Sequence, residues 1–157
     1  MKRPRPPRRI VVGVDGSPAS YEALRWAVQQ AQLTGARLEA WGVYDVPGAA
    51  GWSGHVVDAT YDAVQARQAL SDEIRAVLAR ADDVPLEEHV SPGNPARVLT
   101  EASEGADLLV VGSRGRGGFA SLLLGSVSQQ CAMHAACPVV IVRSATFDAE
   151  SGTESDS

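Results

Sequence analysis

Short apolar runs and longer amphipathic segments alternate along the chain. The runs are rich in β-branched or alternating apolar residues and predict five strands, at residues 10–14, 37–44, 86–90, 107–111 and 138–142. Four intervening segments repeat their apolar residues at helical spacing and predict helices, at about residues 18–34, 61–80, 96–104 and 126–135. Because each parallel strand pair needs a crossover, usually a helix, the alternation predicts one α/β domain with a mostly parallel sheet.

Several residues mark where these elements begin and end. Ser17 is a favourable N-cap, Pro18 fits the first position of a helix, and Gly35 suits its C-cap. The continuous β-branched run at residues 10–14 predicts a strand that is covered on both faces. At residues 86–90, Leu86, Glu88 and Val90 alternate against Glu87 and His89, a mostly polar pattern that indicates an edge strand.

Charged residues gather at the two ends of the chain, which has 157 residues and a formal net charge of −5. We expect a disordered basic arm at residues 1–9 and a disordered acidic tail at residues 144–157. The folded domain is then expected at residues 10–143. Because that domain is acidic and has few cations, a broad nucleic-acid-binding surface is not expected.

Membrane insertion, thiol chemistry and metal binding find little support in the composition. No apolar run reaches the roughly 18 residues of a transmembrane helix, and residues 1–9 lack a signal-peptide core, so a cytoplasmic protein is expected. Cys131 and Cys137 match neither a C-x-x-C pair nor a zinc site, and we expect both to be buried. His55, His89 and His134 show no metal-ligand spacing, so no metal site is expected.

The most distinctive chemistry lies in the glycine-rich segment at residues 112–128. It follows a predicted strand and leads into a predicted helix, and it contains Gly112, Gly115 and Gly125. Glycines let backbone N–H groups approach an oxyanion, and a helix N-terminus adds unpaired donors. The segment also supplies hydroxyl groups and positive charge, at Ser126, Ser128, Arg114 and Arg116. These features predict a cradle for the phosphates of a nucleotide.

A second set of polar residues follows the first predicted strand, beginning with Asp15. In open α/β sheets, ligands bind beyond the carboxyl ends of strands where the winding reverses. If the first and fourth strands are neighbours there, Asp15 and the Gly112 loop face one crevice. Three roles are then open for Asp15: a turn residue, an acceptor for the ribose or base, or a ligand of Mg²⁺. Ser126 is an N-cap, a phosphate contact, or both.

Two common nucleotide motifs do not fit this segment. No Lys-Ser or Lys-Thr pair follows the loop, which excludes a Walker A motif. The glycines also do not form a G-x-G-x-x-G sequence directly at the start of a helix, so a dinucleotide fingerprint is absent.

Three motifs, in the same order along the chain, resemble the universal stress protein family. Residues 10–17 (IVVGVDGS) resemble its first strand and turn, and residues 137–143 (CPVVIVR) resemble its last strand. The spacing Gly112-x2-Gly115-x9-Gly125-Ser126 is similar to that of the family's ATP-binding subclass. The resemblance extends from about Arg9 to Arg143.

The resemblance implies an open, Rossmann-like parallel sheet of order 3-2-1-4-5 with helices on both faces. It implies ATP, with or without Mg²⁺, as a regulatory or structural ligand in a stress response. It also implies a cytoplasmic homodimer paired through the last strand. By position, it places the nucleotide contacts at Val14, Asp15, Val43, Gly112, Ser113, Arg114, Gly115, Gly125, Ser126, Val127 and Ser128.

Two alternatives stay open beside this interpretation. One is a slow ATPase or a nucleotidyl-transfer enzyme of the same fold class, which would need a positioned base and a metal site. The sequence offers only Asp15 for these roles, so we expect at most slow ATP hydrolysis. The other is an interaction module that binds no nucleotide, against which the intact glycine motif argues.

Overall fold

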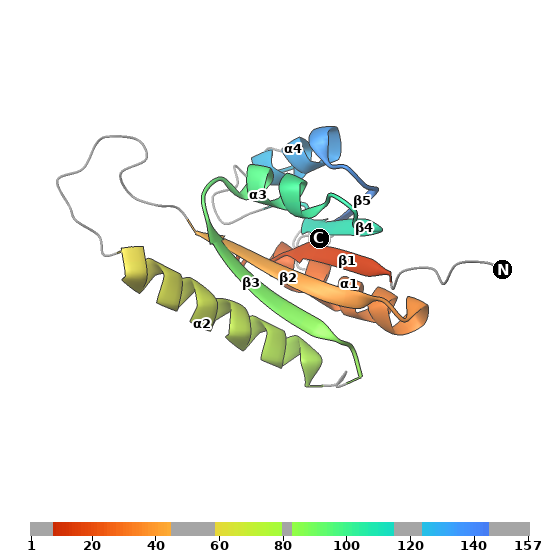
Figure 1. Ribbon diagram of the computed structural model, residues 1–157, viewed down its shortest axis with the longest axis horizontal. Helices are drawn as coiled ribbons and strands as arrows, with labels where there is room; N and C mark the ends of the chain where they lie inside the picture. The colour runs from red at the N-terminus through yellow and green to blue at the C-terminus, as the bar shows by residue number, and fades with distance from the viewer. Residues whose placement is uncertain (1–7, 45–58, 80–82, 115–123, 145–157) are drawn as a thin grey trace, which may run out of the picture.

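The computed structural model describes residues 8–44, 59–79, 83–114 and 124–144. Within these ranges strands and helices alternate, as the sequence pattern predicts (Figure 1). The strands are β1 (Arg9–Gly13), β2 (Arg37–Tyr44), β3 (Leu86–Pro92), β4 (Leu108–Gly112) and β5 (Val139–Val142). The helices are α1 (Pro18–Thr34), α2 (Ala59–Leu78), α3 (Pro95–Ala102) and α4 (Ser126–His134).

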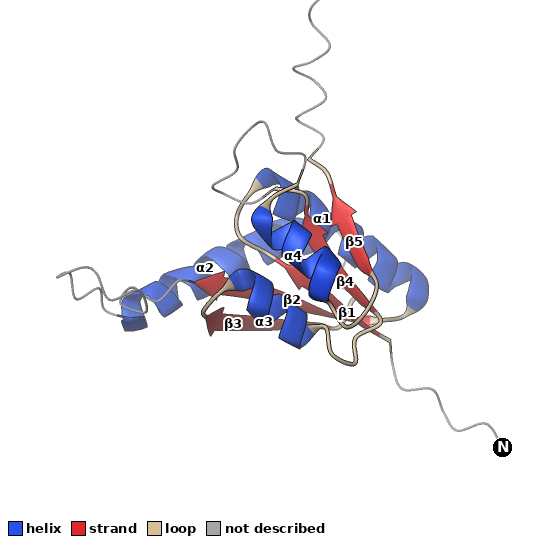
Figure 2. Cartoon of the chain, turned by 90° about the horizontal axis from the view of Figure 1, so that it is seen from above, coloured by secondary structure: helices blue, strands red, loops and turns tan. Residues whose placement is uncertain are grey.

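All five strands form one parallel sheet in the order β3-β2-β1-β4-β5. This is the order that the family resemblance implies, and it confirms the prediction that residues 86–90 lie at an edge. Helices α1 and α2 pack on one face of the sheet, and α3 and α4 pack on the other (Figures 1 and 2). The fold is therefore a single-domain, doubly wound α/β sheet.

Alternate residues of β1 supply the two cores. Val12 faces α1 and α2, where it packs in a cluster with Leu24 and Leu70. Val11 faces the opposite way, into a cluster with Leu99 of α3 and Cys131 of α4. Both valines are fully buried, which explains the continuous apolar run of this central strand.

The predicted helix signals act as expected. Ser17 Oγ accepts a hydrogen bond from the N–H of Ser20, and α1 starts at Pro18. Gly35 ends α1 in the left-handed conformation, with φ of 70°. The side chain of Asn94 caps α3 by accepting from the N–H of Arg97.

Arg9 belongs to the sheet, so the prediction that it lies in a disordered arm is wrong. Its guanidinium donates to Glu39 Oε2 over 2.7 Å and to the carbonyls of Ala102 and Glu104, over 3.2 and 2.6 Å. Its backbone N–H donates to Asp107 Oδ2 over 2.8 Å. These four bonds hold the start of β1 to β2, to the end of α3 and to the residue before β4, which a flexible arm would not do.

Two further expectations need correction. Gly125 is the N-cap of α4 and Ser126 is its first helical residue, so Ser126 is not an N-cap. Cys131 is buried as expected, but Cys137 is only partly buried. Residues 1–7, residues 145–157, His55 and Gly115 lie outside the described residues, so the expectations for them stay predictions. In the part of the chain described here, no helix has the length and apolar character to cross a membrane.

Candidate functional site

The chain reverses its winding between β1 and β4, which are hydrogen-bonded neighbours with Val12 opposite Val110. Asp15 follows the carboxyl end of β1, and Gly112 ends β4. The two polar segments singled out in the sequence therefore lie at the same edge of the sheet. This is the position at which open α/β sheets bind their ligands.

A cavity of about 80 Å³ lies at this edge, between the sheet and helices α3 and α4. Its lining includes seven of the predicted site residues, namely Val14, Asp15, Val43, Gly112, Arg114, Val127 and Ser128. Further lining residues come from the strands and from the starts of α1 and α3, namely Gly13, Ser20, Trp41, Pro95, Leu99 and Val111. Most of this lining is apolar, with polar groups concentrated near Asp15 and Arg114.

Hydrogen bonds at the first turn of α1 tie the two loops together. Asp15 Oδ1 accepts from the N–H of Ser17 over 2.9 Å, which closes an Asx turn. Ser17 Oγ, the N-cap of α1, also donates to the carbonyl of Arg114 over 3.3 Å. The turn role proposed for Asp15 is thus present, and it uses one oxygen of an exposed carboxylate.

Ser113 and Ser128 hold together the two ends of the loop between β4 and α4. The carbonyl of Ser113 accepts from the N–H of Gly125 over 2.7 Å and from Ser128 Oγ over 3.2 Å. Ser128 Oγ also lies 2.9 Å from the carbonyl of Gly125. Both serines are buried, so their bonds fix the direction in which α4 leaves the loop.

The start of α4 differs from the starts of α1 and α3. Ser17 and Asn94 each cap their helix through the side chain, whereas the N-cap of α4 is Gly125 and makes no side-chain cap bond. The first backbone N–H groups of α4 therefore lack the side-chain acceptor that the other two helices have, and a helix start of this kind suits an anion. Ser126 lines not the cavity but an adjoining groove of about 870 Å³ between α3 and α4.

Gly112 is a glycine for a reason that the sequence did not reveal. A Cβ at this position would lie 2.7 Å from the carbonyl carbon of Ala19 and 2.8 Å from the nitrogen of Ser20. These are backbone atoms of the first turn of α1, so the end of β4 and the start of α1 approach too closely for any side chain. Close packing alone thus requires glycine here, whatever the loop binds.

Trp41 is the most notable lining residue outside the predicted set. It shares a face of β2 with Val43, so the alternation along the strand already contained a signal for it. Its indole stacks on the His89 ring, with centroids 4.5 Å apart and planes 12° from parallel. Trp41 Nε1 also donates to Glu39 Oε2 over a long 3.4 Å.

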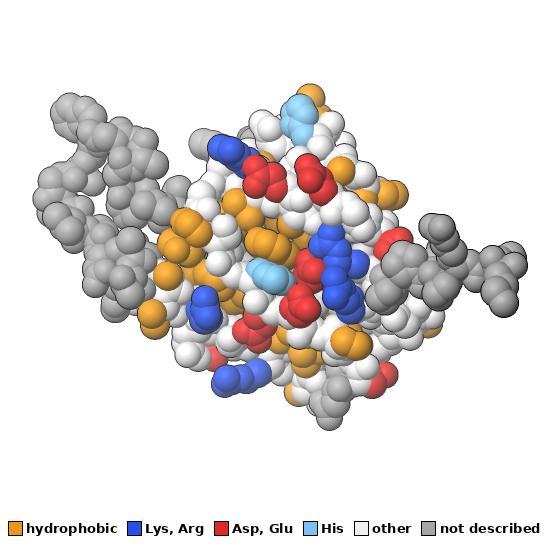
Figure 3. Space-filling view, in the orientation of Figure 1, with side chains coloured by type: hydrophobic (Ala, Val, Ile, Leu, Met, Phe, Trp, Pro, Cys, Tyr) orange, Lys and Arg blue, Asp and Glu red, His pale blue; other side chains and the backbone are white. Residues whose placement is uncertain are grey.

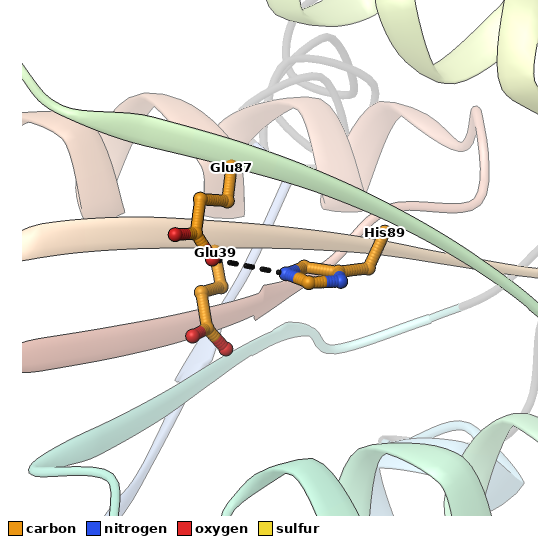
Figure 4. A group of neighbouring side chains, drawn as sticks. All are labelled: Glu39, Glu87 and His89. Carbon is orange, nitrogen blue, oxygen red and sulfur yellow. Dashed lines mark hydrogen bonds and ion pairs between the residues drawn. The ribbon is translucent and has the colours of Figure 1, made fainter.

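A charged cluster on the same face contains Glu39, Glu87 and His89 (Figure 4). One ligand atom from each lies within 4.8 Å of the others, and His89 Nε2 is 3.3 Å from Glu87 Oε2. However, Glu39 is already paired with Arg9 at 2.7 Å and with Arg37 at 3.7 Å. Acidic and basic side chains accordingly lie close together in Figure 3.

The charges in this cluster argue against a metal ion. The two guanidinium groups balance the two carboxylates, so a cation would enter a neutral site. It would also have to displace Arg9 from Glu39, a pair whose side chains are 18% and 8% exposed. We therefore interpret the cluster as an ion-pair network that supports the sheet.

The surroundings of the two cysteines disfavour the thiolate form of each. Burial raises the pKa of the Cys131 thiol from 9.0 to about 11. Burial also raises the pKa of Cys137, and Arg9 opposes that shift. Because the thiolate is the reactive form, both shifts disfavour thiol chemistry near neutral pH.

Comparison with known proteins gives a consistent result. The model of the universal stress protein family matches residues 6–143. The chain is 39% identical over 137 residues to Universal stress protein Rv2623 of Mycobacterium tuberculosis, a match that covers 85% of this chain and 44% of that protein. The chain thus spans less than half the length of this curated relative.

Two solved structures match over nearly their whole length. Universal stress protein UspA from Lactobacillus plantarum has a TM-score of 0.73 and 26% identity, covering 87% of this chain and 97% of its own. A universal stress protein crystallised in complex with cAMP has a TM-score of 0.62 and 30% identity, covering 88% of this chain and 98% of its own.

Proposed function

The chain belongs to the universal stress protein family, and from that premise we propose that it binds ATP as a regulatory or structural ligand. The observation that carries the proposal is that seven predicted contact residues line one cavity, at the reversal point of the sheet. The 30% identical relative in complex with cAMP supports an adenine nucleotide as the ligand class. Within that class we favour ATP, because the glycine spacing of this chain resembles that of the family's ATP-binding subclass.

Different residues of the lining suit different parts of the proposed ligand. Val14, Val43, Pro95 and Leu99 are apolar and suit the flat surface of a base. Arg114 also lines the cavity, as do Val127 and Ser128 of the first turn of α4, and the positive charge and backbone N–H groups there suit phosphates. Gly115 belongs to the same predicted cradle and stays a prediction.

Asp15 is the natural partner for the ribose or for a Mg²⁺ ion that enters with the phosphates. Magnesium is commonly held by one or two carboxylates together with substrate phosphates, and an exposed carboxylate beside the cavity fits that requirement. The Asx turn occupies Oδ1 with one bond, and a carboxylate has acceptor capacity for more. The turn and ligand roles of Asp15 are therefore compatible.

The function proposed for the nucleotide is linkage rather than catalysis. ATP would stabilise the bound state and order the loops around it, and this would alter what the protein contacts in a stress response. The described lining offers a single carboxylate, Asp15, and that group already closes a turn. We therefore propose ATP binding with at most slow hydrolysis.

We further propose a homodimer paired through β5. This strand is an edge of the sheet, all of its residues are only partly buried, and all are apolar. The carbonyls of Pro138 and Val142 accept from the N–H groups of Leu109 and Ser113, so in a parallel ladder Val139 and Ile141 direct their backbone groups away from the sheet. Such an edge is a template for a second copy of the same strand.

The first experiment identifies the ligand directly. The purified protein is denatured, and the released small molecules are separated and identified. Release of an adenine nucleotide supports the proposal, and calorimetry with ATP then gives the affinity. If nothing is released and calorimetry detects no binding of ATP or cAMP, the proposal fails.

Asp15 offers a second test that separates its two roles. Asparagine can close the same Asx turn as aspartate but carries no charge. We expect both Asp15→Asn and Asp15→Ala to weaken ATP binding by about 1–3 kcal/mol, the usual scale for a lost charged hydrogen bond. Wild-type affinity in Asp15→Asn with weak binding in Asp15→Ala would show that only the turn matters.

A further inference from the structure

Trp41 occupies a distinctive place in the cavity wall. In the register of the sheet it lies between His89 on β3 and Gly13 on β1. The indole stacks on the His89 ring on one side. On the other side Gly13 has no side chain, and the space above it is approached by Leu99, whose Cδ1 would be 2.8 Å from a Cβ at that position.

Because Gly13 has no side chain, Leu99 of α3 occupies the space above it and lies on this side of Trp41. Gly13, Trp41 and Leu99 all line the cavity, together with Pro95 and Val43. The indole is therefore backed by a parallel ring on the β3 side while it contributes to the wall of an apolar space. This is the environment in which aromatic side chains bind other flat rings.

The residues behind Trp41 hold the indole in this position. Glu39 accepts the indole N–H and is itself fixed by Arg9 at 2.7 Å. Glu87 contacts His89 Nε2 at 3.3 Å and thereby orients the ring that stacks on the indole. Trp41 thus has its polar edge and its β3-facing side both supported, which limits the conformational freedom lost on binding.

We propose that Trp41 is the stacking surface for the base of the bound nucleotide and that His89 is a positioning residue that holds the indole parallel to it. The proposal rests on the nucleotide binding proposed above and assigns its base-recognition contact. Stacking on an indole accepts any base because every base has a π face. Selection among bases therefore has to come from other groups of the cavity.

The test measures ATP affinity by calorimetry for wild type and four variants. Trp41→Ala removes the stacking surface and is expected to weaken binding about tenfold, since base–aromatic stacking is worth ~1–3 kcal/mol per base. Trp41→Phe keeps a ring and is expected to bind within about threefold of wild type. His89→Ala removes the supporting ring and is expected to weaken binding severalfold, whereas His89→Phe restores a stacked ring and the affinity.

Two readouts separate stacking from a general effect on the fold. Urea denaturation of each variant gives its stability. If His89 had a merely structural role, ATP affinity would follow the stability of the variants and not the presence of a ring at residue 89. Tryptophan emission gives a direct signature: ATP is expected to change it in wild type and not in Trp41→Phe, in which Trp26 and Trp52 remain.

Each result decides between the two proposals. Wild-type affinity in Trp41→Ala would overturn the stacking role while leaving nucleotide binding intact. Equal affinities of wild type, His89→Ala and His89→Phe would overturn the positioning role. If wild type itself neither releases a nucleotide on denaturation nor binds ATP, both the proposed function and this inference fail.

Discussion

Replacement of Gly112 by alanine tests whether this glycine is needed for packing or for close approach of the ligand. The added Cβ would lie 2.7 Å from the carbonyl carbon of Ala19, about 0.8 Å inside the roughly 3.5 Å at which carbon atoms attract. The nitrogen of Ser20 and the Cβ of Ala19 would lie at 2.8 and 2.9 Å. Since most of these are backbone atoms of a helix turn, they cannot rotate away.

The expected cost follows from that geometry. Overpacking of a well-ordered core costs about 1–3 kcal/mol, and a clash with backbone belongs at the upper end of this range. Gly112 has no positive φ, so strain in the backbone of the new alanine adds nothing. The lower conformational entropy of the unfolded alanine variant offsets about 0.4–1 kcal/mol of this loss. We therefore expect a net loss of about 2 kcal/mol in the free energy of unfolding.

Two other glycines provide matched controls. A Cβ on Gly13 would meet Leu99 Cδ1 at 2.8 Å, but this is the end of a side chain that can rotate, so about 1 kcal/mol is expected. A Cβ on Gly42 would meet its nearest neighbour, Leu70 Cδ2, at 3.5 Å, which is ordinary contact. Gly42→Ala should therefore leave stability unchanged or raise it slightly.

The assay is urea denaturation of the three alanine variants, followed by circular dichroism, with ATP affinity measured on each folded variant. The packing argument predicts that stability falls in the order Gly42→Ala, Gly13→Ala, Gly112→Ala. A Gly112→Ala variant as stable as Gly42→Ala would refute it. If that stable variant also lost ATP binding, close approach of the ligand would be the reason for the glycine.

Three further predictions follow from particular contacts. Arg9→Ala should lower the free energy of unfolding, measured in urea, by about 3 kcal/mol, because it leaves the buried Glu39 without its main partner. Arg37 is 45% exposed, so Arg37→Ala should lower it by less than about 1 kcal/mol, and equal losses in the two variants would contradict this. The thiol pKa of Cys131 rises on folding from 9.0 to about 11, so the stability that the protonated thiol contributes is complete below pH 9 and is lost as pH rises from 9 through 11. That loss amounts to about 3 kcal/mol and should be absent in Cys131→Ala, as unfolding curves across this pH range would reveal. Ile141→Pro should shift sedimentation toward monomer without loss of helix signal, because its N–H faces away from β4; a wild type that is monomeric at high concentration would refute the dimer.

Local signals were sufficient for most of the fold. Ser17, Pro18 and Gly35 act within a few residues of their own position, so their roles as cap and stop signals could be predicted without knowledge of the tertiary structure. The same holds for Asn94 at the start of α3. The strand order, in contrast, came from the family resemblance, because periodicity alone cannot tell which strands are neighbours.

What escaped prediction depends on contacts between distant parts of the chain. Arg9 binds groups that are 30, 93 and 95 residues away, so its sequence neighbourhood indicated only a basic arm. The stack of Trp41 on His89 exists because the two residues are register partners on adjacent strands. The requirement for glycine at Gly112 likewise arises from the first turn of α1, far away in the sequence.

Several groups of the described site also stabilise the local structure, and this determines which variants are informative. Asp15 closes a turn, Ser128 anchors a loop, and Gly112 permits the contact between β4 and α1. Loss of binding after removal of any of these would follow from a distorted site as readily as from a lost contact. Asp15→Asn and Trp41→Phe avoid this ambiguity, because the first can keep the turn and the second keeps a ring. A nucleotide contact is therefore best established by pairs of variants that preserve the structural role and change only the chemistry offered to the ligand.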